Sequence, residues 1–161
     1  MYYLENKSLY VVTIILSILY MSKSVKSRAP KNKTRKGFKT TVVRRFLEML
    51  NSIKLYHWKT QSYSQHKATD EIHEKLSANV DRFVEVMLGK DQSRITMIDK
   101  TMKMGHAKNT DDFKDQIFSY RTTIIKLLSQ CHKKKDSDLE NILAEMLADI
   151  NQFLYLLSFD K

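Results

Sequence analysis

Glycine and proline are nearly missing from this chain, and their scarcity limits its fold more than any other feature. The 161 residues include three glycines and one proline. Because these two residue types supply most tight turns, the sequence disfavours a sheet of many short strands. A chain of this length can hold one domain with a substantial core. The sequence therefore predicts long helices joined by few loops.

Apolar residues recur at three- and four-residue steps from Thr41 onward, which is the spacing of amphipathic helices. The pattern predicts long helices over Thr41 to about Thr60, His66 to Leu88, a stretch beginning at Asn109-Thr110, and a stretch opened by a capping box at Ser137–Glu140, with a short helix over Gln92–Met104 between the second and third. Residues 41–161 are thus expected to form an all-α four-helix bundle.

The expected core follows these apolar stripes. It consists of Val42, Val43, Phe46, Leu47, Leu50, Ile53 and Leu55 in the first helix; Ile72, Leu76, Val80, Phe83, Val84 and Met87 in the second; Phe113, Ile117, Tyr120, Ile124, Leu127 and Leu128 in the third; and Leu139, Ile142, Leu143, Met146, Ile150, Phe153, Leu154 and Leu157 in the fourth.

The net charge of +10 is concentrated in one segment of the chain. Residues 22–45 contain ten basic residues and no acidic residue, while the remainder is close to neutral. Residues 22–40 are polar and are predicted to form a disordered basic arm. The arm could bind the phosphate backbone of nucleic acid without sequence preference; anionic lipid headgroups or a solubilising role are the alternatives. Its basic residues are Lys23, Lys26, Arg28, Lys31, Lys33, Arg35, Lys36 and Lys39.

Residues 1–21 form an apolar leader. Its Leu9–Met21 stretch is 13 residues long, whereas a membrane-spanning helix needs about 20. It also lacks the basic start and cleavage site of a signal peptide. Three interpretations remain: an upstream start with Met21 as the true initiator, a short membrane anchor, or a helix that packs on another protein. The single cysteine, Cys131, cannot form an internal disulfide, which fits a reducing compartment such as the cytoplasm.

Histidines and carboxylates at regular spacings predict a metal site. His66 and Asp70 are four residues apart, as are Asp81 and Glu85, so each pair shares one face of the second helix. Mixed imidazole and carboxylate ligands suit iron, manganese or zinc. Taken singly, these residues could instead be an exposed surface pair, and His57 could be a core histidine bonded to a carbonyl. Their joint spacing favours the metal interpretation.

The two pairs cannot reach one metal ion within one chain. Asp70 and Asp81 are eleven residues apart, which is about 16 Å along a helix, whereas metal–ligand bonds are about 2 Å long. Two chains placed antiparallel would bring the His66/Asp70 end of one against the Asp81/Glu85 end of the other. A two-fold axis near the middle of this helix would create that arrangement twice.

The pattern His57-Trp58, His66-x-x-x-Asp70 and Asp81-x-x-x-Glu85 resembles the ferroxidase signature of Dps proteins, the ferritin-like DNA-protecting proteins of starved bacteria. The resemblance covers about residues 50–88. It implies a ferritin-like bundle with metal ligands His57, His66 and Asp70 from one subunit, Asp81 and Glu85 from its partner, and Trp58 beside the site. It also implies iron as the metal, a dodecameric shell, and a nucleoid location. The chain is similar, too, to uncharacterised ferritin-like proteins of large DNA viruses, which would be virion-associated.

The sequence departs from this family at two points. The connection from His57 to His66 is shorter than usual and lacks its glycine. No Glu-x-x-His pattern exists, so the di-iron centre that ordinary ferritins hold inside one bundle is disfavoured. His73 is expected at the surface.

Two hypotheses of different classes follow. The first is a Dps-like mini-ferritin that oxidises Fe²⁺ and stores ferric iron. The second is a non-enzymatic packaging protein of ferritin-like fold that binds nucleic acid or membrane.

Overall fold

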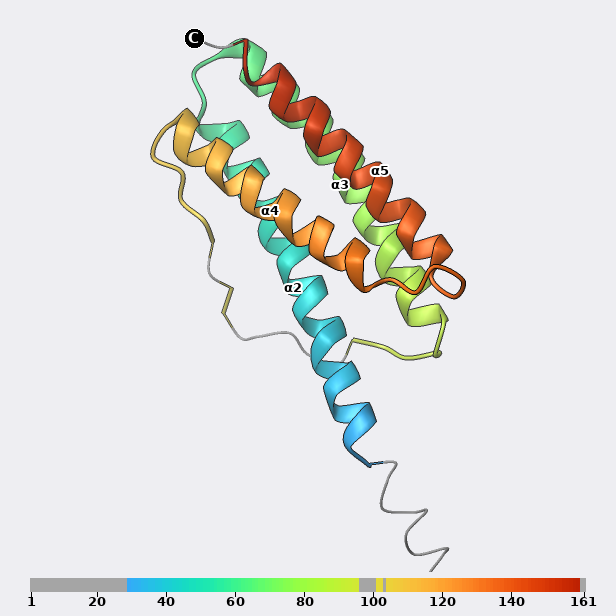
Figure 1. Ribbon diagram of the computed structural model, residues 1–161. Helices are drawn as coiled ribbons and strands as arrows, with labels where there is room; N and C mark the ends of the chain where they lie inside the picture. The colour runs from blue at the N-terminus through green and yellow to red at the C-terminus, as the bar shows by residue number, and fades with distance from the viewer. Residues whose placement is uncertain (1–28, 96–100, 103, 160–161) are drawn as a thin grey trace, which may run out of the picture. The chain divides into compact units, whose positions relative to one another are not determined.

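Four helices make up the described part of the molecule. The computed structural model describes residues 29–95, 101–102 and 104–159 (Figure 1). Its helices are α2 (Ala29–Lys59), α3 (Tyr63–Gly89), α4 (Thr110–Gln130) and α5 (Ser137–Leu156), and these described residues contain no strand. The chain divides between Lys39 and Thr40 into two units, and the bundle belongs to the unit Thr40–Lys161. The prediction of an all-α four-helix bundle is confirmed.

The first and last of the four helices, α2 and α5, each pack on both α3 and α4. Phe46 of α2 contacts Phe83 of α3 edge to face, with 5.3 Å between the ring centroids. Tyr56 of α2 stacks on Phe113 of α4, with 3.8 Å between the ring centroids. Helix α5 packs along both α3 and α4. Helices α3 and α4 begin at the same end of the bundle (Figure 1), where Gln65 Nε2 donates to Thr110 Oγ1 over 3.4 Å. The connection between them therefore returns along the bundle, a topology compatible with ferritin-like folds.

The core was predicted closely from helical periodicity. Most predicted positions are buried, and Leu47, Leu50, Val84, Tyr120, Leu128 and Leu154 are partly buried against the core. Leu55 is a wrong prediction because its side chain is 37 % exposed. The helix turns about 100° per residue, so the inward positions near Leu55 are instead Met49, Ser52, Ile53 and Tyr56.

The helix ends follow local capping chemistry, with two differences from expectation. Asn109 caps α4 by accepting from the Asp112 amide over 2.9 Å, as predicted. Helix α2 begins at Ala29 and not at Thr41, so residues 29–40 of the predicted basic arm are helical. Pro30 suits this start, because the first turn of a helix needs no amide N–H there.

The start of α5 is the second difference. The residue before its first turn is Asp136 rather than Ser137, and Asp136 makes no side-chain cap. Its carboxylate instead accepts from the His132 amide over 3.0 Å and pairs with Lys90 Nζ at 3.2 Å. The hydrogen bond from His132 lowers the pKa of Asp136. This side chain joins α3 to the α4–α5 loop, so it is not available as a cap.

The short helix expected over Gln92–Met104 is not seen in the described residues of the connection, 90–95, 101–102 and 104–109. Gln92 has a φ of 53°, which lies outside the right-handed helical region. The Asp91 carboxylate also accepts from the Ser93 amide over 3.3 Å. Residues 91–93 therefore form a turn that ends α3.

Within the residues that the structure describes, no helix combines the length and apolar character needed to cross a lipid bilayer. The leader at residues 1–21 lies outside the described residues.

Candidate metal centre

Two histidine rings stack where α2 turns into α3. His57 is in the last turn of α2, and His66 is in the first turn of α3. Ser62 caps α3 by accepting from the Gln65 amide, which fixes the sharp corner between the helices. The ring centroids are 3.9 Å apart and the planes differ by 24°. His57 is buried and His66 is exposed. The shortened His57–His66 connection thus still brings the two imidazoles together.

Reciprocal hydrogen bonds orient both rings. His57 Nδ1 donates to the carbonyl of His66 over 3.0 Å, and His66 Nδ1 donates to the carbonyl of His57 over 3.1 Å. A carbonyl can only accept, so each neutral ring carries its proton on Nδ1 and has a lone pair on Nε2. His57 therefore has the features expected under the alternative interpretation, a buried histidine bonded to a carbonyl. Metal-binding histidines share this orientation, with the second ring nitrogen donating to a carbonyl.

Thr69 supports the same corner from inside. Its hydroxyl donates to the Gln65 carbonyl over 2.7 Å and lies 3.2 Å from His57 Nδ1. Behind it, the Tyr56 hydroxyl donates to Gln65 Oε1 over 2.7 Å and lies 2.9 Å from Thr110 Oγ1. Buried polar groups with satisfied hydrogen bonds stiffen their surroundings, so the imidazoles rest on a rigid base.

The carboxylate of Asp70 lies near His57 and accepts a hydrogen bond from Lys54. Its Oδ1 lies 3.9 Å from His57 Nε2 and 3.2 Å from Lys54 Nζ. The hydrogen bond from Lys54 lowers the pKa of Asp70, so this exposed carboxylate is ionised at neutral pH. The carboxylate of Asp70 therefore lies near the His57 imidazole at this corner.

Trp58 and His73 flank this group. Trp58 is 70 % exposed, and Lys54 Nζ lies 6.0 Å from the centre of its ring. His73 is half-buried, which differs from its expected surface position. Burial, with the positive charge of Lys54 as a smaller cause, lowers the pKa of His73, so its imidazole is neutral at neutral pH.

Asp81 and Glu85 lie elsewhere on α3, and both are exposed. By helix rise, Asp81 lies about 16 Å and Glu85 about 22 Å from Asp70, which separates both from the histidines. Among the described residues, no three histidine, cysteine or acidic side chains are grouped closely enough to hold a metal ion. One chain thus holds the histidines and Asp70, which would form one half of the predicted site (the half-site), apart from the Asp81 and Glu85 pair.

The bundle interior offers no alternative metal centre in the described part of the chain. Its centre is filled by Met49, Leu76, Ile117, Leu143 and Met146, all nearly inaccessible. The carboxylates of α5 instead link it to α3. Glu145 pairs with Arg82, and Asp149 accepts from Asn79 over 3.4 Å.

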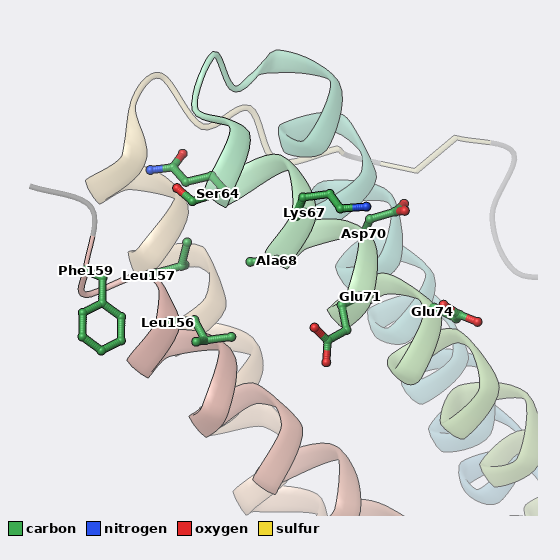
Figure 2. A pocket seen from close by; sticks show the side chains of 10 residues that line it. Ser64, Lys67, Ala68, Asp70, Glu71, Glu74, Leu156, Leu157 and Phe159 are labelled. Carbon is green, nitrogen blue, oxygen red and sulfur yellow. The ribbon is translucent and has the colours of Figure 1, made fainter.

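A groove of about 500 Å³ opens beside the half-site, between the start of α3 and the end of α5 (Figure 2). Asp70, Glu71 and Glu74 line it from α3. Leu156 and Phe159 line it from the end of α5 and beyond. Lys67 also lines the groove from α3, and Asp70 belongs to both the histidine corner and this groove.

Comparison with known proteins gives a family for this chain. The model of DUF5856, described as a family of unknown function, matches residues 57–157. The chain belongs to DUF5856. No curated protein and no solved structure gave a significant match. The matched region begins at His57, so the five predicted ligands lie inside the DUF5856 region, whereas Lys54 and the basic arm precede it.

Lys54 and Thr69 of this DUF5856 chain were not predicted from the sequence. Lys54 precedes His57 by one helical turn, but its partner Asp70 is sixteen residues away on another helix. Thr69 gives no signal beyond its position one turn after His66. Of the predicted nucleic-acid-binding residues, Lys23, Lys26 and Arg28 lie outside the described residues, and the other five belong to α2.

The burial of His73 predicts a pH dependence of stability. Because its folded-state pKa is lowered, the unfolded chain binds more protons, so stability falls as the pH drops through about 6.5 and levels off below the folded-state pKa. His73→Gln should flatten this part of the curve. Urea unfolding in EDTA between pH 8 and pH 5 measures it. A variant with the wild-type slope would show that His73 does not titrate differently in the two states.

Proposed function

We propose that this protein is a Dps-like mini-ferritin that oxidises Fe²⁺ at sites shared by two subunits and stores the ferric product. The observation that carries the proposal is the pair of reciprocal bonds between His57 and His66. They leave the Nε2 atom of each ring without a backbone partner, and His57 Nε2 lies 3.9 Å from the ionised carboxylate of Asp70. Imidazole and carboxylate ligands together suit iron, with manganese and zinc as alternatives.

The second half of each site would come from a partner subunit. Asp81 and Glu85 are exposed and one turn apart, so they can present two carboxylates to a neighbouring molecule. An antiparallel pair of α3 helices would complete two equivalent sites per dimer. The resemblance to Dps proteins implies that such dimers assemble into a dodecameric shell.

The proposed chemistry is a two-electron reduction of peroxide. Two Fe²⁺ ions each lose one electron, and one H₂O₂ with two protons takes both electrons, so that its O–O bond breaks and two waters form. Carboxylates stabilise the more highly charged Fe³⁺, and the oriented imidazoles set the ligand geometry. Molecular oxygen is the alternative oxidant.

Loss of one carboxylate of the far half-site should stop the reaction. Purified Asp81→Ala is expected to oxidise Fe²⁺ at least about tenfold more slowly than wild type, because ligand support is worth at least that much. Absorbance of the ferric product measures the rate. Asp115→Ala removes an exposed carboxylate from α4 and should leave the rate unchanged.

This experiment also separates the two candidate functions. If wild-type protein oxidises iron no faster than Asp81→Ala, the non-enzymatic alternative is favoured. In that case the chain is a packaging protein of similar fold that binds nucleic acid or membrane.

Nucleic-acid association through the basic arm is a separate part of the proposal. The eight basic residues of positions 22–40 have no acidic residue among them. Replacing all eight by glutamine should abolish salt-sensitive retention on immobilised DNA, because counterion release drives such binding. Iron oxidation should persist in this variant. Unchanged retention would show that the arm is not the tether.

A further inference from the structure

One oxygen atom of Asp70 faces two nitrogen atoms of α2. Oδ1 lies 3.2 Å from Lys54 Nζ and 3.9 Å from His57 Nε2. A metal ion shared by Asp70 and His57 would need this oxygen and this nitrogen, or the second oxygen after rotation of the carboxylate. A positively charged group therefore stands where the half-site would take a cation.

Two features hold the Lys54 ammonium in this position. It lies 6.0 Å from the centre of the Trp58 ring, within the range of a cation–π contact. Its side chain is 30 % exposed, against 58 % for Asp70, so part of its stem is sheltered. Lys54, His57 and Trp58 are spaced by three and four residues and so share one face of α2.

We propose that Lys54 is an internal competitor for the metal ion: it neutralises Asp70 in the metal-free chain and must be displaced before Asp70 can coordinate. This inference rests on the proposed metal site and adds a residue that sets its affinity. The displaced ammonium would remain near a divalent cation and repel it. Lys54 thereby weakens binding, and the metal must supply the energy that separates the Lys54–Asp70 pair.

Removal of the lysine charge should strengthen metal binding. Zinc is the probe, because it binds to imidazole and carboxylate and undergoes no redox reaction. We expect Lys54→Met to bind Zn²⁺ about three- to tenfold more tightly than wild type in calorimetric titration, given the modest strength of exposed ion pairs. Lys54→Arg keeps the charge and should stay near the wild-type affinity.

A matched lysine on α3 controls for general charge effects. Lys75 pairs with Glu71 over 2.8 Å and lies 4.0 Å from Asp149, toward α5. Lys75→Met removes the same charge but frees no proposed ligand, so it should change the zinc affinity by less than about twofold.

The fluorescence of Trp58 reports the displacement itself. It is the only tryptophan in the chain, and zinc does not quench by redox chemistry. Zinc should shift the emission of the wild-type chain as the ammonium leaves the ring. The same addition should give less than about half of that shift in Lys54→Met, where no ammonium can leave.

The outcomes separate this inference from the proposed function. The inference is supported if Lys54→Met binds zinc more tightly than wild type while Lys54→Arg and Lys75→Met do not. Equal or weaker binding by Lys54→Met, with wild-type binding that is lost in Asp81→Ala, would overturn the role of Lys54 and retain the shared site. Zinc binding by neither wild type nor any variant would overturn both.

Discussion

The fixed rise of a helix separates the two halves of the proposed site. Asp70 and Asp81 belong to the same continuous helix, α3, and its backbone holds them about 16 Å apart. No rearrangement of side chains closes that distance to the bond lengths of a metal site. The described part of one chain contains no group of three histidine, cysteine or acidic side chains that could hold a metal ion. A metal site built from both pairs therefore requires a second copy of the chain.

The corner between α2 and α3 would supply the two imidazole ligands of the proposed site. Backbone carbonyls accept from both Nδ1 atoms, so the orientation of each ring is set by the helices and not by a metal. In the proposed site the imidazoles would thus be preorganised, which would lower the cost of binding. Lys54 would weaken metal binding, because its ammonium group donates a hydrogen bond to the Asp70 carboxylate. Two opposing effects would set the metal affinity. The oriented imidazoles would favour binding, and the ion pair between Lys54 and Asp70 would disfavour it.

Helical periodicity predicted the bundle and most of its core, since residues such as Ile72, Leu76 and Val80 repeat along one face of α3. It could not predict the Lys54–Asp70 bond, which joins two helices across a corner. The expected short helix is not seen in the described residues of 92–104, where Gln92 adopts a left-handed conformation that its sequence neighbours do not signal. The spacing of His57, His66 and Asp70 suggested a common site, but only the fold shows which ring nitrogen each histidine leaves available.

Complementation between two inactive variants tests the shared site most directly. His66→Ala damages one half-site and Asp81→Ala the other, so each alone should oxidise little Fe²⁺. In co-expressed chains, about half of the dimers are mixed, and each mixed dimer has one intact site of its two. The account predicts about a quarter of the wild-type oxidation rate for the mixture. A mixture no faster than its separate components would contradict a site built from two subunits.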